Sequence, residues 1–283
     1  MGVTDCHVHI NPIAEMRPDA LGLLAGVDPA NARLLGDPTA FLEYLDTCGV
    51  ERAVLVNYVA PEVIGYTEAT NRFVGEYVRA DPDRLIACGG IRPDHPDPER
   101  EVDRLVSEFG IRAIKLHPPH QLFRPNAYVD DPRSTLRALY AAAERRRLPV
   151  IFHTGTSVFP RARNRYSDPL YVEDVALDFP DLTIVLAHGG RPIWMETAVF
   201  LARRFPNVWL ELSGVPPNRL LEYFPQLARI AAKTLFGTDW PGPGVRDLGA
   251  NLRAFRALPL AEEAARRILE ENPLVVFPRR APS

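Results

Sequence analysis

The chain has 283 residues, of which 46% are apolar and 24% are charged, as in ordinary globular proteins with room for one large α/β domain or two smaller ones. These values exclude an intrinsically disordered chain, and no apolar run approaches the roughly 20 residues of a transmembrane helix. The net charge of −3 gives no general attraction to nucleic acid or to anionic membranes. Because the first predicted strand begins at Val3 and the three cysteines are scattered, we expect no secretory signal and a cytoplasmic protein with free, buried thiols.

Short runs rich in β-branched residues alternate with amphipathic helices along the whole sequence. The predicted strands are residues 3–9, 51–59, 84–91, 111–118, 148–155, 182–190, 208–214 and 234–240. The predicted helices are residues 38–48, 67–80, 97–109, 132–147, 170–179, 193–205, 218–232 and 247–257, with an additional C-terminal helix over 260–271. Asp-Pro pairs such as Asp131-Pro132 and Asp168-Pro169 are typical helix starts.

Eight such strand–helix units in about 250 residues predict the α/β class and a (β/α)8 TIM barrel, as a single domain over residues 1–283. A doubly wound open sheet is the alternative, but no Gly-x-Gly-x-x-Gly follows any strand. The one long irregular stretch, residues 10–37, follows the first strand and therefore lies over the C-terminal face of a barrel. It is either a lid over a bound ligand or a decorative insertion.

Ionisable side chains gather at the ends of the predicted strands, where the active sites of barrels lie. Alternation along an extended strand places His7 and His9 on the same face. Burying so many polar groups without partners is costly, so the pattern predicts a functional site. Three histidines and one carboxylate suit Zn²⁺ or another borderline divalent ion, with a position left for water. The residues at these strand ends are His7, His9, Lys115, His117, His153, His188, Glu211 and Asp239.

Two of these residues have expected catalytic roles. Asp239, beside a metal-bound water, is the natural general base, and His188 is the natural second acid/base or oxyanion stabiliser.

A set of motifs running from residue 3 to about 277 resembles the amidohydrolase superfamily, most closely the branch that includes aminocarboxymuconate-semialdehyde decarboxylase and the resorcylate-type decarboxylases. The resemblance implies a barrel with one divalent metal held by His7, His9, His153 and Asp239. It also implies that His188 is a catalytic residue near the metal. The motifs are Asp5-x-His7-x-His9, Ile114-Lys115-Leu116-His117-Pro118, Phe152-His153-Thr154-Gly155, Ala187-His188-Gly189-Gly190, Gly237-Thr238-Asp239-Trp240-Pro241 and Glu271-Asn272-Pro273.

Lys115 leaves the number of metal ions open between one and two. It is one of only two lysines among 33 basic residues. In other amidohydrolase branches a lysine on the fourth strand is carboxylated and bridges two metals, and this chain has the residues for that arrangement. The run around Lys115 instead resembles the mononuclear branch, where the lysine holds a substrate carboxylate. We favour one metal.

Further residues carry weaker expectations. His95 and His120 lie in proline-rich loops and are expected at the surface, whereas His117 is closer to the site. Glu211 is expected either to orient a ligand histidine or to pair with an arginine. Arginines after the fifth and sixth strands suit a small anionic organic substrate, because guanidinium groups match carboxylates. These substrate-binding candidates are Arg161 and Arg191, with Arg163 and Arg165 in the same loop as Arg161.

The leading hypothesis is a hydrolase that uses a metal-activated water on a lactone, amide or ester bond of a small carboxylated substrate. The alternative is a non-oxidative decarboxylase of an aromatic or unsaturated acid on the same metal site. A TatD-like nuclease resembles the chain at the His-x-His and the late Asp, but it would carry Glu at the position of Lys115. We therefore expect no nucleic-acid or membrane partner, and a homodimer is the default oligomer.

Overall fold

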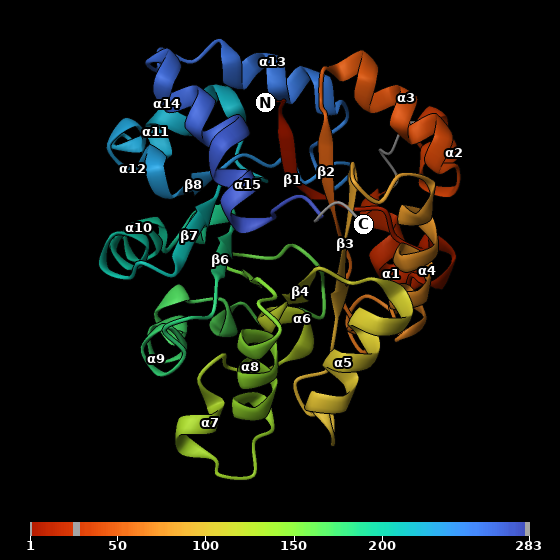
Figure 1. The fold of residues 1–283 in the computed structure, drawn as a ribbon, viewed down its shortest axis with the longest axis vertical. Helices are drawn as coiled ribbons and strands as arrows, with labels where there is room; N and C mark the ends of the chain where they lie inside the picture. The colour runs from red at the N-terminus through yellow and green to blue at the C-terminus, as the bar shows by residue number, and fades with distance from the viewer. Residues whose placement is uncertain (1, 25–28, 281–283) are drawn as a thin grey trace.

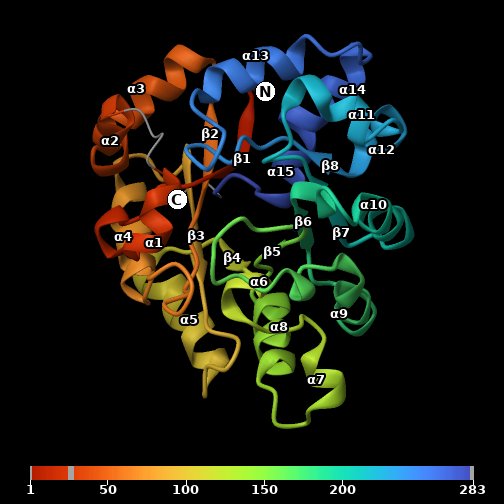
Figure 2. The same cartoon turned by 180° about the vertical axis from the view of Figure 1, so that it is seen from behind.

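In the computed structural model, which describes residues 2–24 and 29–280, eight parallel strands form a nearly closed barrel with helices around it (Figures 1 and 2). All eight predicted strands are present, each shorter than its sequence pattern. The strands are β1 (Thr4–Val8), β2 (Arg52–Val56), β3 (Leu85–Gly90), β4 (Ala113–Leu116), β5 (Val150–His153), β6 (Ile184–Ala187), β7 (Val208–Glu211) and β8 (Thr234–Leu235). Each strand pairs in parallel with the next, which confirms the TIM barrel.

The barrel closes between the first and last strands. Beyond the end of β8, Val8 and Trp240 form a parallel bridge, and the amide of His9 donates to the carbonyl of Trp240 over 2.7 Å. The amide of Asp239 donates to the carbonyl of His7 over 2.8 Å. This seam therefore brings the beginning and the end of the sequence together at the carboxyl ends of the strands.

The helices follow the predicted order. Their bounds are α1 (Pro18–Leu21), α2 (Pro29–Gly36), α3 (Pro38–Cys48), α4 (Ala69–Tyr77), α5 (Pro98–Phe109), α6 (Pro118–Gln121), α7 (Ala127–Asp130), α8 (Leu136–Arg145), α9 (Val172–Asp178), α10 (Met195–Arg204), α11 (Leu220–Tyr223), α12 (Leu227–Ile230), α13 (Leu248–Arg256), α14 (Glu262–Arg266) and α15 (Asn272–Val276).

Proline explains where the helices depart from expectation. The predicted helix over 218–232 is split into α11 and α12, and Pro225 lies at the break, where a missing amide hydrogen prevents a continuous ladder. The predicted C-terminal helix 260–271 continues to Val276 through a wider π turn over Arg267–Glu271. That turn precedes Pro273 and accommodates its ring. Asp131-Pro132 does not start a helix, since α8 begins at Leu136.

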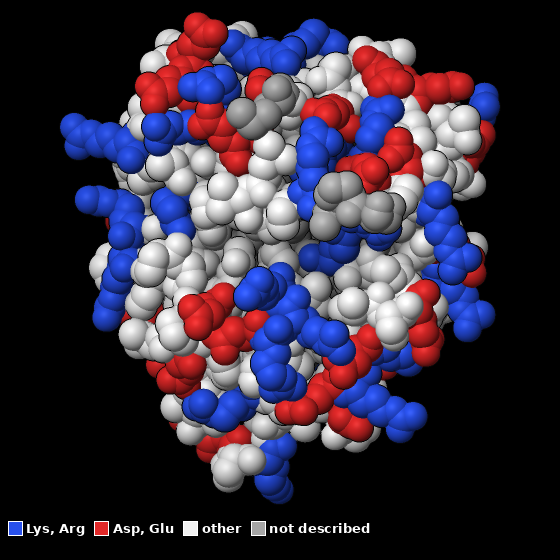
Figure 3. Space-filling model, in the orientation of Figure 1, with Lys and Arg blue, Asp and Glu red and all other residues white. Residues whose placement is uncertain are grey.

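Two long helices begin at an Asp-Pro pair. The carboxylate of Asp37 accepts the amide of Ala40 at the start of α3, and the carboxylate of Asp97 accepts the amide of Arg100 at the start of α5. On the outer surface, Arg145 of α8 and Arg146, the residue after it, pair with Glu99 and Asp103 of α5. Basic and acidic side chains are therefore interspersed on the face in Figure 3.

Between the buried Arg52, which donates to the carbonyl of Phe277, and the level of the site, the barrel interior is apolar. Ala113 precedes Lys115 by two residues and Ile151 precedes His153 by two, so each pair shares the inward face of its strand. Cys6 and Cys88 are buried free thiols, as expected, and Cys48 is only partly buried. No helix in residues 2–24 and 29–280 is long and apolar enough to cross a membrane.

Residues 10–37 contain short helices rather than the expected irregular chain. A 3₁₀ turn (Ile13–Glu15), α1, a second turn (Gly22–Leu24) and α2 make up the segment, of which residues 25–28 lie outside the described part. Met16 and Leu35 line the central cavity, so the segment forms part of the cavity wall. Closure of this segment over a ligand remains a prediction.

Candidate metal centre and active site

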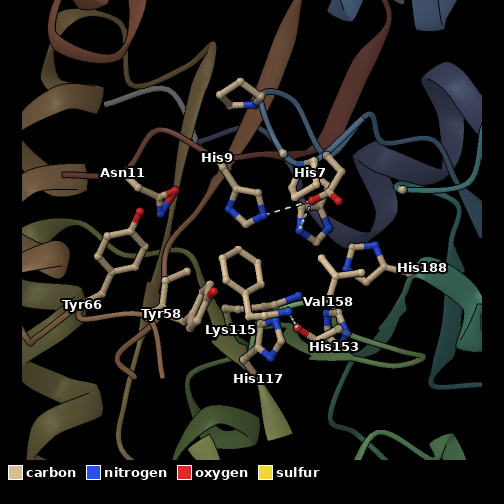
Figure 4. Close-up of a pocket in the computed structure, with 18 of the residues that line it drawn as sticks. His7, His9, Asn11, Tyr58, Tyr66, Lys115, His117, His153, Val158 and His188 are labelled. Atoms are coloured by element: carbon tan, nitrogen blue, oxygen red, sulfur yellow. Dashed lines mark hydrogen bonds and ion pairs between the residues drawn. The ribbon is translucent and has the colours of Figure 1, made fainter. Parts of the chain in front are cut away.

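A cavity of about 290 Å³ opens at the carboxyl ends of the strands, and the predicted site residues lie around it (Figure 4). Figure 4 shows His7, His153 and His188 on one side of this space and Tyr58, Tyr66 and Asn11 on the other. The predicted residues in its lining are His7, His9, Lys115, His117, His153, His188, Arg191 and Asp239.

His7 and His9 present the same ring nitrogen to the cavity. His7 Nδ1 lies 2.9 Å from a Glu211 oxygen, and His9 Nδ1 lies 2.9 Å from the carbonyl of Val56. A carbonyl oxygen only accepts, so His9 Nδ1 is the donor, and burial keeps the pKa of His7 well below its usual value. Both Nε2 atoms are therefore free to donate a lone pair to a metal ion.

Asp239 completes a cluster with these two histidines. One of its carboxylate oxygens lies 3.0 Å from His9 Nε2 and 3.7 Å from His7 Nε2. Burial alone would raise the pKa of Asp239, but its neighbours His9, His7 and Arg191 lower it to about 2, so the carboxylate is ionised and can act as a ligand. The three donor atoms lie within 4.8 Å of one another, which is close enough for one ion to bind all three.

Asp5 holds the two strands that carry this cluster. Its carboxylate accepts the amide of His7 (3.1 Å), the amide of Thr238 (3.0 Å) and the hydroxyl of Thr238 (2.7 Å). Burial raises the pKa of Asp5 to about 7 despite these bonds. The first residue of the Asp-x-His-x-His motif therefore fixes the position of Asp239 relative to His7.

Four buried polar atoms of residues that line the cavity have no partner in the described residues. These are Nε2 of His7, Nε2 of His153, Nδ1 of His117 and Nζ of Lys115. Leaving buried polar atoms unpaired is costly, and a divalent ion would satisfy the two Nε2 atoms. The donor set of three imidazoles and one carboxylate therefore fits a Zn²⁺-like ion. His153 is not part of the 4.8 Å cluster; its ring centroid lies 4.6 Å from that of His188.

His188 is fixed by Ser213. His188 Nδ1 lies 3.1 Å from the carbonyl of Ser213 and 2.9 Å from its hydroxyl, which in turn donates to Glu211 over 2.7 Å. Because the carbonyl and this hydroxyl oxygen both accept, Nδ1 carries the proton and neutral His188 has its lone pair on Nε2. Ser213 therefore joins the predicted catalytic histidine to the carboxylate that orients His7. Sequence reasoning missed Ser213, although it follows Glu211 by two residues on the same strand end.

Lys115 and Arg191 are the two cations of the cavity wall. Burial lowers the pKa of Lys115 to about 8, against the opposing effect of Glu211. Arg191 donates to the carbonyls of Gly214 (2.7 Å) and Thr156 (3.2 Å), and its Nη2 lies 3.7 Å from Asp239. Arg161 is not in the cavity lining; it is half exposed and pairs with Asp19 on α1.

The expectation for His120 is wrong. Its side chain is buried, with 1% of the residue exposed, because α6 turns inward and stacks the ring on His117 with centroids 3.6 Å apart. His117 in turn stacks on His153 at 3.9 Å. His95 is half-buried in its loop. Tyr58 and Ser157, which contact His120, line the cavity and were not predicted.

The model of the amidohydrolase family matches residues 4–279. The chain belongs to the amidohydrolase family. This amidohydrolase is therefore a metal-dependent enzyme of the hydrolase or decarboxylase type. Comparison with curated proteins finds no match.

Three solved structures resemble this amidohydrolase. An uncharacterized TIM-barrel protein from Bordetella bronchiseptica has a TM-score of 0.74 and 25% identity, over 98% of each chain. The 5-carboxyvanillate decarboxylase of Sphingomonas paucimobilis has a TM-score of 0.66 and 18% identity, over 99% of each chain. A lactonase of Listeria monocytogenes has a TM-score of 0.58 and 13% identity, over 99% of this chain and 95% of that one. The last two support the barrel fold and do not select a reaction.

Proposed function

We propose that this amidohydrolase hydrolyses a lactone, amide or ester bond in a small carboxylated substrate with one divalent metal, Zn²⁺ being the first choice. The observation that carries the proposal is the meeting of free imidazole Nε2 atoms with the Asp239 carboxylate at the end of the cavity. His7, His9, His153 and Asp239 would hold the ion. When bound there, it lowers the pKa of a coordinated water and polarises a substrate carbonyl.

His188 is placed to move the proton of the attacking water. Its Nε2 lone pair faces the cavity because Nδ1 donates to Ser213. Nε2 therefore accepts a proton as the water attacks and returns it to the leaving group. Asp239, which is ionised at neutral pH, is the second proton acceptor beside the cluster.

Lys115 and Arg191 are suited to hold the carboxylate of the substrate. Both line the cavity, and Lys115 Nζ has no partner within the described part of the chain. A carboxylate bound there would satisfy this buried ammonium group and place the reacting carbonyl beside His188.

Decarboxylation of an aromatic acid is the second candidate, and the wall facing the cluster favours it. Tyr58, Tyr66, Phe159 and Ile64 form an apolar, mostly aromatic surface on which an unsaturated ring would pack. The same metal and cations would then hold the carboxylate that leaves as carbon dioxide.

A substrate panel with two detectors separates the candidates. Metal-loaded enzyme is given lactones, esters, anilides (whose aniline product stays neutral, so that their hydrolysis also releases a proton) and hydroxybenzoic acids, while proton release and carbon dioxide are measured together. Hydrolysis gives acid without carbon dioxide, and decarboxylation gives carbon dioxide. His188→Asn should lose either activity, whereas His95→Asn, a histidine in a surface loop, is the matched control and should keep it. Activity that persists in His188→Asn would contradict the proposed role.

A further inference from the structure

Three polar side chains form a hydrogen-bonded chain in the cavity wall away from His188. Tyr58 Oη lies 3.0 Å from His120 Nδ1, and Ser157 Oγ lies 2.7 Å from His120 Nε2. Tyr58 and Ser157 line the cavity, while His120 lies behind them. Both nitrogens of one buried imidazole are thus bonded to hydroxyl groups that a ligand can contact.

The surrounding structure keeps this chain rigid. Gln121 donates to the carbonyls of Val59 (2.9 Å) and Ile91 (2.8 Å) and accepts the amide of His117, which fixes α6. Asn164 accepts the amide of Ser157 and donates to its carbonyl, which fixes the loop after β5. Side chains held this firmly are typical of binding sites.

The hydrogen-bonded chain of Tyr58, His120 and Ser157 contains one hydrogen that neither of its two hydrogen bonds uses. Burial lowers the pKa of His120 to about 3, so its imidazole is neutral, with one N–H and one lone pair. The two hydrogen bonds use two of the three hydrogens that Tyr58, His120 and Ser157 share. Ser157 Oγ also accepts the amide of Phe159 over 3.3 Å. One hydroxyl hydrogen is therefore left to point into the cavity.

We propose that Tyr58, His120 and Ser157 bind a second carboxylate of the substrate, and that the tautomer of His120 selects which hydroxyl donates to it. With the proton on Nδ1, His120 donates to Tyr58, and Tyr58 donates to the ligand. With the proton on Nε2, His120 donates to Ser157, and Ser157 donates to the ligand. This inference rests on the proposed function, and it narrows the substrate class to dicarboxylates.

Both proposed carboxylate positions lie in one cavity. Lys115, Arg191, Tyr58 and Ser157 all line the same space of about 290 Å³. A small ligand whose first carboxylate lies by Lys115 and Arg191 can therefore present its second to Tyr58 or Ser157 within that cavity.

The first test reads the tautomer directly and needs neither substrate nor turnover. Long-range ¹H–¹⁵N spectra of ¹⁵N-histidine-labelled protein give the protonated nitrogen of His120, assigned by the signal missing in His120→Gln. Tyr58→Phe should fix the proton on Nε2, which still donates to Ser157, and Ser157→Ala should fix it on Nδ1, which still donates to Tyr58. The same tautomer in both variants, or a doubly protonated ring, would overturn the proposal.

The second test measures binding of isophthalate, a rigid dicarboxylate, by calorimetry. Each single variant keeps one donor and should weaken binding by no more than about threefold, while the double variant should weaken it by about tenfold or more. Tyr223→Phe, a tyrosine outside the cavity lining, is the control and should not change the affinity. Failure of isophthalate to bind, or additive effects of the two substitutions, would overturn the proposal. Neither test depends on the reaction, so failure here is distinct from failure of the hydrolase proposal.

Discussion

His7 and Glu211 share a 2.9 Å hydrogen bond between two side chains that are almost fully buried, on strands at opposite ends of the sequence. Glu211 also accepts the amide and the hydroxyl of Ser213, over 2.6 and 2.7 Å. One carboxylate thus orients a proposed metal ligand and, through Ser213, the proposed catalytic His188.

Replacing Glu211 should therefore weaken metal binding. Glu211→Gln keeps the size of the side chain but removes the charge that makes His7 a stronger ligand. We expect the metal affinity to fall about 10- to 100-fold. Competition with a chromophoric chelator measures the change, and the exposed Glu222→Gln is the control. An unchanged affinity would show that His7 does not hold the metal through the nitrogen opposite Glu211.

The site residues should divide into two groups. His153→Ala and Asp239→Asn should lose both metal and activity, because they remove ligands. His188→Asn should keep the metal and lose activity by a factor of about 10² to 10⁴, the usual effect of removing a general acid or base. Metal content by plasma emission spectroscopy and turnover are measured on the same samples. Loss of a metal equivalent in His188→Asn would place His188 among the ligands.

Lys115→Met tests the number of metal ions. With one ion, wild type and variant should each contain one equivalent, and the variant should bind substrate more weakly. Removing a buried, unpaired ammonium group should also raise the Tm, by about 2 °C or more. Two equivalents in the wild type falling to one in the variant would instead indicate a carboxylated, bridging Lys115.

Removing the metal should lower stability. An ion that binds only the folded protein stabilises it by about 2.7 kcal/mol when its free concentration is 100 times its Kd. Thermal unfolding with excess Zn²⁺ and with a chelator should therefore differ in Tm, and His153→Ala should reduce that difference. A Tm that does not respond to either reagent would contradict the proposed centre.

Lys233 should make stability depend on pH in the alkaline range. Burial lowers its pKa from 10.5 to about 8, so between these values the unfolded chain binds more protons than the folded protein. Stability should therefore rise as pH increases from about 8 to 10.5, relative to Lys233→Met, which lacks the group. Denaturant unfolding at several pH values measures this difference. Arg229 lines the same surface hollow as Lys233. Arg229→Gln is therefore the control, and its stability should change with pH in parallel with that of the wild type.

The sequence predicted the features of the fold and site that a single local pattern of residues determines. Short apolar runs rich in β-branched residues predicted all eight strands, and the His-x-His spacing predicted that His7 and His9 share a face. The turn of α6 that buries His120 depends on the packing of His117 against His153, which no local pattern contains. Ser213 and Ser157 were missed for a related reason: a serine acquires its role only from the histidine that the fold places beside it.

The backbone conformation of two site residues also could not be predicted from the sequence. His188 and Asp239 both have positive φ, 65° and 68°, a region that side chains other than glycine rarely adopt. The hydrogen bonds of Ser213 to His188 and of His7 to the amide of Asp239 help to hold these conformations. Such local strain is typical of functional sites and cannot be recognised from residue type.

The pairing of β1 with the segment after β8 determines the stage of protein synthesis at which the site can form. His7 is synthesised 232 residues before Asp239. A nascent chain can therefore offer the metal His7 and His9 but not the complete cluster. On the proposed ligand set, capture of the ion is a late event in biosynthesis, coupled to the closing of the barrel, and a chain truncated before Asp239 should bind the metal more weakly than the whole chain.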